Sequence, residues 1–372
     1  MTLLDVHTLL SSSALVGLAT LSVYAGSVGS YNAPVETKCL PTTSDEPIPE
    51  GTSHGVSLRT RHALVGVALV VLSVPAYLFI GQMAQDPMTK FIRFMYCVVS
   101  IQSLCWTSAS LTRFLLGAQR YRRIPRIRLV LNETRLFIDF EYCSTRPDPP
   151  TTSTLQGIRL TTVLYLVISI AASISHMFGT KSVYMSNLLM LSLAHVDMSL
   201  VKPSRLRTVC IFLASTPILF SWPALSLGYG TLALSGAPNL NNPSQLVVPT
   251  ALVQPAPAIV LSALDIIFPG KLVAFAYRLD AHLLYEGKRG RITYFGTTLV
   301  TYAIALSIAI GAMHVFGVAQ LASLYISPMC FLAFVGVTFV RGEQRYVWGW
   351  SEGACESVSW IRSTMGGLQI EW

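Results

Sequence analysis

The stretch Ala258-Ile-Val-Leu-Ser-Ala-Leu-Asp-Ile-Ile-Phe-Pro-Gly-Lys-Leu-Val-Ala-Phe-Ala-Tyr277 is apolar along most of its length. A helix that crosses a bilayer needs about 20 such residues, so this stretch predicts a membrane segment. Asp265 lies inside it, ahead of a Pro269-Gly270 break. An ionisable residue at the centre of a membrane helix costs about 2.5–3.5 kcal/mol to insert, which makes Asp265 a candidate functional residue. The alternative is a packing residue that pairs with Lys271 or with a backbone group.

The composition of the whole chain is that of a membrane protein. Of its 372 residues, 52% are hydrophobic and only 12% are charged, whereas about 25% of the residues of a soluble domain are charged. We therefore predict an all-α polytopic membrane protein with about nine transmembrane helices. The apolar runs place these helices at about residues 9–28, 63–83, 91–116, 160–178, 183–201, 209–229, 252–277, 294–316 and 319–340.

Basic residues in the connections predict the orientation of the chain. They gather in alternate connections and in the tail: Arg120, Arg122, Arg123, Arg126, Arg128, Arg135 and Arg146, then Lys202, Arg205 and Arg207, then Arg278, Lys288, Arg289 and Arg291, and finally Arg341, Arg345 and Arg362. The connection 231–250 carries no charge. By the positive-inside rule, the N-terminus is luminal and the C-terminus cytosolic. Orientation in the lipid bilayer also accounts for the arginines at 120–128, so no nucleic-acid partner is expected.

The cysteines give no sign of a metal site. All seven lie outside any CxxC pair and show no spacing typical of metal ligands. Packing residues and loop thiols account for them. No metal and no cofactor are therefore expected.

Two motifs in the seventh segment resemble a known family. Asp265-Ile-Ile-Phe-Pro-Gly and the following Ala274-Phe-Ala-Tyr-Arg-Leu-Asp280 are similar to the seventh helix of signal peptide peptidases, which are intramembrane aspartyl proteases with a presenilin-like bundle of helices. Shorter matches follow in the family's order: Ser186-Asn-Leu-Leu, Gln245-Leu-Val-Val-Pro249, Met313-His-Val-Phe316, Ala319-Gln320 and Arg341-Gly-Glu343.

This resemblance implies an organisation of the chain. Residues 1–157 would hold the first three membrane helices, residues 158–345 the protease-like core with helices four to nine, and residues 346–372 a cytosolic tail. It also implies transmembrane or signal-peptide helices as partners, and the endoplasmic reticulum or another endomembrane as location. The oligomeric state is not predicted.

The residues that carry catalysis in the family have changed in this chain. The family uses two aspartates that share one proton, one acting as acid while the other activates water. Only Asp265 remains, at the position of the helix-seven aspartate. The helix-six Tyr-Asp position holds Trp222-Pro223. The substrate-contacting positions implied by the resemblance are Ser262, Ala263 and Leu264 in place of Gly-x-Gly, Gln320, and Leu321, Ala322 and Ser323 in place of Pro-Ala-Leu.

Three functions remain open at this point. We expect a catalytically impaired homologue that binds transmembrane segments. An active intramembrane aspartic endopeptidase needs a second carboxylate near Asp265, for which Asp197 is the nearest candidate, although a charge paired with Lys202 explains Asp197 more simply. A transporter or channel would use Asp265 and Lys271 as a charge relay. Lys271 could also extend to the cytosolic surface.

Overall fold

The structure is a computed structural model. It describes residues 6–30, 56–58, 85–122, 124, 126–132, 135–141, 158–178, 182–203, 205–211, 213–214, 232–235, 245–249, 258–288, 290–317 and 322–351. The predicted segment 63–83 and most of the segment 209–229 lie outside these residues. The chain divides into two compact units, residues 1–85, 197–239 and 244–372, and residues 86–196 and 240–243.

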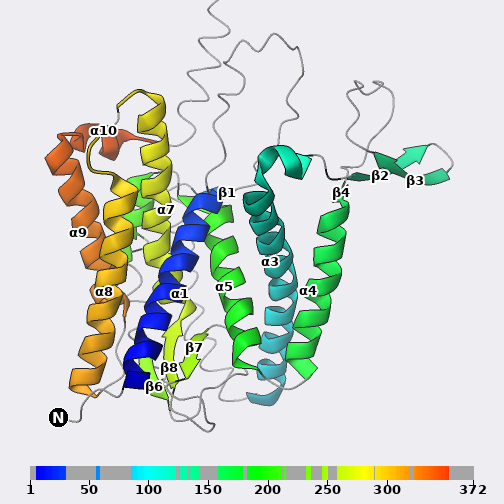
Figure 1. The fold of residues 1–372 in the computed structure, drawn as a ribbon, viewed down its shortest axis with the longest axis horizontal. Coiled ribbons are helices and arrows are strands. Elements are labelled where there is room, and N and C mark those ends of the chain that lie inside the picture. The colour runs from blue at the N-terminus through cyan, green and yellow to red at the C-terminus, as the bar shows by residue number, and fades with distance from the viewer. Residues whose placement is uncertain are drawn as a thin grey trace, which may run out of the picture. The chain divides into compact units, whose positions relative to one another are not determined.

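The first unit is built around one helix that is buried along most of its length. Figure 1 shows the helices of this unit. Its helices are α1 (Val6–Ser30), α7 (Ala263–Tyr285), α8 (Tyr294–Phe316), α9 (Ser323–Arg341) and the short α10 (Gln344–Gly349). Helix α7 packs against α1, α8 and α9. From Asp265 to Leu279, all of its residues except Phe268 and Tyr277 are buried. A helix that is apolar around its whole circumference belongs in the interior of a bundle, which agrees with this position.

Strands precede α7 where the sequence predicts helix. β8 (Ala258–Ser262) pairs antiparallel with β6 (Leu232–Ser235) and with β7 (Gln245–Pro249). A continuous apolar run is compatible with a buried strand as well as with a helix, and here the strand partners decide. The prediction of one helix over 252–277 is therefore wrong at its start. Among its described residues, this unit also contains a parallel pair of strands, β1 (Val56–Leu58) with β5 (Val201–Pro203).

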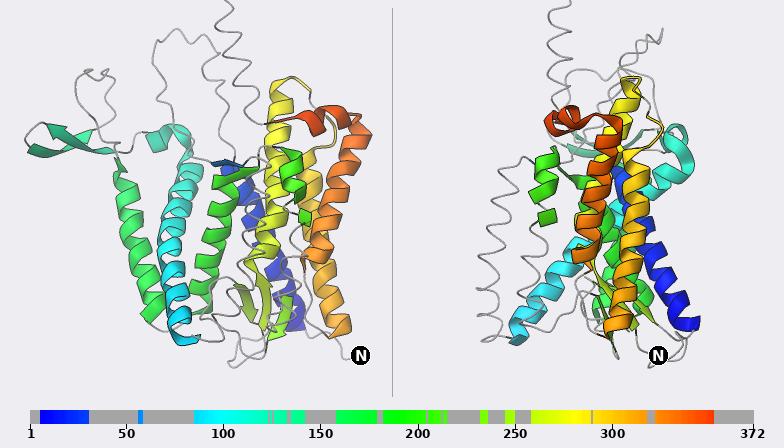
Figure 2. Two further views of the ribbon diagram at one scale, coloured as in Figure 1. Left: turned by 180° about the vertical axis from the view of Figure 1, so that it is seen from behind. Right: turned by 90° about the vertical axis from the view of Figure 1, so that its left-hand side faces the viewer.

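The second unit contains α3 (Gln85–Arg122), α4 (Leu160–Phe178) and most of α5 (Val183–Leu200). Between α3 and α4 lies a three-stranded sheet of order β3-β2-β4, made of β2 (Arg126–Asn132), β3 (Arg135–Glu141) and β4 (Ile158–Arg159). In Figures 1 and 2, β2 and β3 run across the direction of α3 and α4, beyond the end where α4 begins. The sequence analysis does not predict this sheet.

The described helices agree with part of the nine-helix prediction. Seven long helices are described, in the regions of the predicted segments one, three, four, five, seven, eight and nine. Among the described residues, three helices are long and apolar enough to cross a membrane: His7–Ser30, Tyr294–Phe316 and Ser323–Arg341. The bounds of α4 and α8 are those predicted. The protein is thus a mostly helical membrane protein, and the total of nine remains a prediction.

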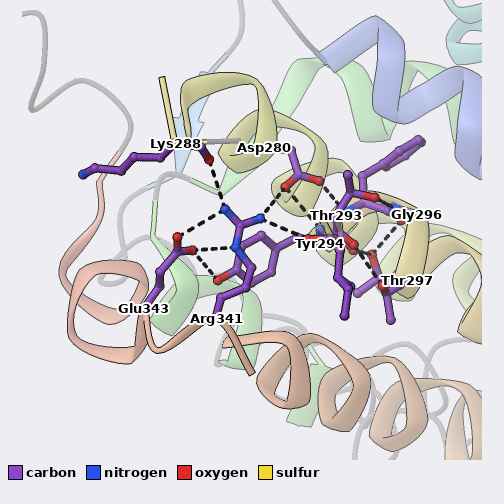
Figure 3. Close-up of polar contacts among 11 residues, drawn as sticks. Asp280, Lys288, Thr293, Tyr294, Gly296, Thr297, Arg341 and Glu343 are labelled. Atoms are coloured by element: carbon purple, nitrogen blue, oxygen red, sulfur yellow. Dashed lines mark hydrogen bonds and ion pairs between the residues drawn. The ribbon is translucent and has the colours of Figure 1, made fainter. Parts of the chain in front are cut away.

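A polar cluster joins the ends of α7, α8 and α9 (Figure 3). Asp280 of α7 accepts hydrogen bonds from the backbone N–H groups of Tyr294 (3.1 Å) and Phe295 (2.7 Å) at the start of α8. Arg341, the last residue of α9, has its guanidinium 3.8 Å from Asp280 and 3.0 Å from Glu343. Asp280 lies beyond the apolar part of α7. Burial raises the pKa of its carboxyl, and the hydrogen bonds from the two backbone N–H groups oppose that rise.

We expect Asp280→Ala to destabilise the protein by about 1–3 kcal/mol, because two N–H groups of the first turn of α8 lose their acceptor. Thermal unfolding in detergent measures the effect. Asp280→Asn retains one acceptor oxygen and should lose less. An Asp280→Ala variant with the melting temperature of the wild type would show that these hydrogen bonds do not hold α7 and α8 together.

Candidate functional site

Asp265 lies where two helices of the first unit begin. Ser262 is the N-cap residue of α7, and its hydroxyl accepts a hydrogen bond from the Leu264 N–H at 3.4 Å. This cap starts the helix at Ala263 and places Asp265 in its first turn. The side chain is 1% exposed, and its Oδ1 accepts a hydrogen bond from the backbone N–H of Ser323 at 3.0 Å.

The bond to Ser323 makes Asp265 a cap for α9. Ser323 is the first residue of α9, and its N-cap residue Ala322 makes no side-chain capping bond. The first N–H groups of a helix lack partners within the helix and carry a partial positive charge. The Asp265 carboxylate of α7 therefore supplies the hydrogen-bond acceptor that the side chain of Ala322 lacks. The first turns of both helices thus meet at Asp265.

Buried hydroxyl groups are present on α8 and α9, the two helices that contribute Tyr302 and Ser323 next to this carboxylate. Tyr302 of α8 is completely buried and interacts electrostatically with Asp265. Within the described part of the chain, its hydroxyl has no hydrogen-bond partner, and the same is true of the Ser323 and Ser327 hydroxyls. An unsatisfied buried hydroxyl costs about 1–3 kcal/mol, so sites of this kind favour a polar ligand or a bound water molecule.

Lys271 and Asp197 form an ion pair deep in the first unit. The Lys271 Nζ lies 2.9 Å from the Asp197 Oδ2, with the Lys271 side chain 5% exposed and the Asp197 side chain 31% exposed. Of the alternatives for Lys271, extension to the cytosolic surface does not agree with the structure, because its side chain is buried and its ammonium is paired with Asp197. Asp197 pairs with Lys271, where the sequence suggests Lys202. A helix rises about 1.5 Å per residue, so Lys271 lies about 9 Å beyond Asp265 along α7.

Close packing accompanies this ion pair. Gly270 precedes Lys271, and a Cβ atom at Gly270 would overlap the sulfur of Met198, which follows Asp197. A Cβ atom at Gly26 of α1 would lie 2.6 Å from the Met198 Cε. Two glycines thus let the Met198 side chain fit between α1 and α7. At the Pro269-Gly270 sequence, Gly270 makes room for Met198, and helix α7 continues without interruption to Tyr285.

The structure places some of the predicted site residues together and leaves others outside. Ser262, Ala263, Leu264, Asp265, Ala322 and Ser323 lie at the junction of β8, α7 and α9. Trp222, Pro223, Gln320 and Leu321 lie outside the described residues. Their assignments, and those of the substrate-contacting positions, remain predictions. Sequence reasoning missed Tyr302 and the Asp197–Lys271 pair. The pair could have been predicted from the sequence, because Asp197 and Lys271 are ionisable residues of opposite sign within apolar segments.

Together, the fold and the site define a class: helical membrane proteins with a buried carboxylate where three helices meet. The chain belongs to the signal peptide peptidase family, whose model matches residues 53–354. This match confirms the resemblance read from the seventh segment.

Individual relatives support the same membership. The chain is 28% identical to a probable intramembrane protease of Schizosaccharomyces pombe over 169 residues, which cover 45% of this chain and 56% of the relative. It is 28% identical to the signal peptide peptidase of Homo sapiens over 188 residues, which cover 50% of this chain and 48% of the relative. The chain thus spans about half the length of the curated relatives that it matches. No solved structure matches it.

Proposed function

We propose that this member of the signal peptide peptidase family is catalytically impaired and binds transmembrane segments without cleaving them. The proposal rests on the contacts that its two candidate carboxylates, Asp265 and Asp197, make in the structure. Asp265 caps α9 through Ser323, and Asp197 is paired with the buried ammonium of Lys271. Aspartic proteolysis needs two carboxylates close enough to share a proton. Neither the capping role of Asp265 nor the ion pair of Asp197 favours two carboxylates that share a proton.

The residues at the other catalytic positions support the same proposal. Trp222-Pro223 stands where the family resemblance places Tyr-Asp. In an enzyme whose catalytic residues act together, removal of one of them costs about 10⁴–10⁶ in turnover. Turnover should therefore be negligible.

A binding role accounts for the polar groups that remain. Tyr302 and Ser323 offer buried hydroxyls beside Asp265, Ser327 offers a third on α9, and within the described residues these hydroxyls have no partner. A transmembrane segment that presents a polar side chain or a free backbone group would satisfy them. We infer transmembrane or signal-peptide helices as partners. The N-terminus is luminal in this proposal, and the membrane is the endoplasmic reticulum or another endomembrane.

The test is a cleavage and binding assay with purified protein in detergent and a signal-peptide-like helical substrate. Wild type, Asp265→Asn and Pro223→Asp are compared. We expect no cleavage by the wild type or Asp265→Asn, and retention of the substrate by all three in a crosslinking readout. If the Pro223→Asp variant gained cleavage activity, this would show in addition that the chain retains the scaffold of the protease.

One result would overturn the proposal. Cleavage by the wild type that Asp265→Asn abolishes would identify an active intramembrane aspartic endopeptidase with a second carboxylate outside the described residues. A wild type that neither cleaves nor retains the helical substrate would remove the binding role. Ion flux through proteoliposomes that depends on Asp265 and Lys271 would instead favour a transporter or channel.

A further inference from the structure

The sheet between α3 and α4 has two faces of opposite character. Successive positions of a strand belong to opposite faces of its sheet. The register of β2 and β3 pairs Ile127 with Phe140, Leu129 with Ile138 and Leu131 with Leu136. All six of these positions belong to one face and all are apolar. The third strand adds Ile158, which pairs with Ile127 and so shares this face.

The opposite face is mainly charged. Its register pairs Arg126 with Glu141 and Arg128 with Asp139. Arg159 of β4 pairs with Arg126 and belongs to the same face. Opposite charges at directly opposed positions stabilise the β2–β3 hairpin, whereas Arg126 and Arg159 are like charges, and the apolar pair Val130 and Phe137 shares this face. The register depends mainly on the apolar face. A slip by one residue would move the apolar set to the charged face.

No described helix covers the apolar face. Among the described elements, β2 and β3 pack extensively only on each other and on β4. Six apolar positions on one hairpin face are more than a solvent-exposed sheet carries without an interaction partner. The described elements therefore supply no cover for this side of the sheet.

The connections of the sheet identify the occupant as the lipid bilayer. β4 continues without a break into α4 at Leu160. Helix α4 is apolar and exposes Leu160, Val163, Leu164, Val167, Ile168 and Ile174, which is the surface expected of a helix in contact with lipid. On the other side, α3 ends at Arg122, a few residues before β2 begins at Arg126. Both ends of the sheet therefore join α3 and α4 directly, at the level where the predicted topology has α3 leave and α4 enter the membrane.

The direction in which the strands run also agrees with a position at the membrane surface. In both side views β2 and β3 run across the axes of α3 and α4, as a sheet lying along a membrane surface would (Figures 1 and 2). At the headgroup level, water still reaches the free edges of the strands, so the backbone polar groups outside the ladder remain satisfied. The flanking arginines are suited to phosphate groups at this depth.

We propose that β2, β3 and β4 form an amphipathic sheet that lies on the bilayer, with its apolar face in the interfacial region. In the orientation predicted from the basic residues, this is the cytosolic leaflet. The sheet anchors the connection between α3 and α4 to the membrane, and it does so whether or not the protein cleaves substrates.

The test uses neighbouring positions of one strand as matched controls. A genetically encoded fluorescent amino acid is placed at Ile138 or Asp139 of β3, and at Leu129 or Arg128 of β2, in the full-length protein. Each variant is incorporated as a single copy into nanodiscs of phosphatidylcholine with or without bromine on the acyl chains. Because an interfacial element lies about 5–10 Å into the boundary between headgroups and acyl chains, we expect probes at Ile138 and Leu129 to lose about half of their emission to brominated lipid. Probes at Asp139 and Arg128 should lose little.

The alternation along each strand decides the outcome. Equal quenching at Ile138 and Asp139, or at Leu129 and Arg128, would overturn the proposal, as would the absence of quenching at every position. Equal quenching would show that the two faces do not differ in their contact with lipid. The absence of quenching would show that neither face meets the acyl chains. If a labelled variant of one strand fails to fold, the pair on the other strand gives the same comparison.

Discussion

Asp197→Leu is expected to destabilise the protein by about 3 kcal/mol or more, because it removes the carboxylate that lies 2.9 Å from the buried Lys271 ammonium. The reverse change, Lys271→Met, should cost less, because the Asp197 side chain is 31% exposed and the Lys271 side chain only 5%. The double variant should recover most of the loss, since well-packed apolar residues often replace a buried ion pair at little cost. Thermal unfolding in detergent measures all three.

A second ion pair of the same length provides the control. The Lys288 Nζ also lies 2.9 Å from its partner, Glu286, but the Lys288 side chain is 56% exposed. Exposed pairs contribute about 0–1 kcal/mol, so Lys288→Met should leave the melting temperature almost unchanged. If Asp197→Leu behaved like Lys288→Met, the burial of the pair would have no energetic consequence. A double variant as unstable as Asp197→Leu would show that packing at this site depends on the charges.

The elements predicted correctly from the sequence are those whose limits are set locally. Helix α8 extends from Tyr294 to Phe316, as predicted, because an apolar run there lies between Thr293, which caps it, and Gly317, which ends it in a left-handed conformation. The start of α7 could not be predicted in this way. Ala258–Ser262 is apolar enough for either structure, and it becomes a strand because β6 and β7, far apart in the chain, pair with it.

The site shows the same limit. The sequence identifies Asp265 as an ionisable residue in an apolar segment, and the family resemblance assigns its position. It does not give the hydrogen bond from Ser323, because that bond joins residues 58 positions apart. Nor does it pair Asp197 with Lys271, since the nearer Lys202 offers the same charge. Interactions between helices depend on the packing of the bundle, which local patterns do not encode.

Asp265→Ala is expected to lower the stability by about 2–4 kcal/mol, because the buried N–H of Ser323 loses its acceptor and the N-terminus of α9 loses a negative charge. Asp265→Asn retains an oxygen at the Oδ1 position and should cost about 1 kcal/mol or less. Circular dichroism and thermal unfolding in detergent separate the two variants. Equal stability of the wild type and Asp265→Ala would show that α9 does not need this cap.

The contrast between these two variants also separates the candidate functions. In a protease, Asp265→Asn removes the acid and abolishes turnover although the protein stays folded. In an impaired homologue, Asp265→Asn changes the stability by about 1 kcal/mol or less and leaves substrate binding unchanged, whereas Asp265→Ala has a larger effect because it loosens the junction of α7 and α9. A carboxylate retained only to cap α9 would tolerate asparagine in every assay. Loss of substrate binding in a stable Asp265→Asn variant would show instead that the charge of Asp265 contacts the bound helix.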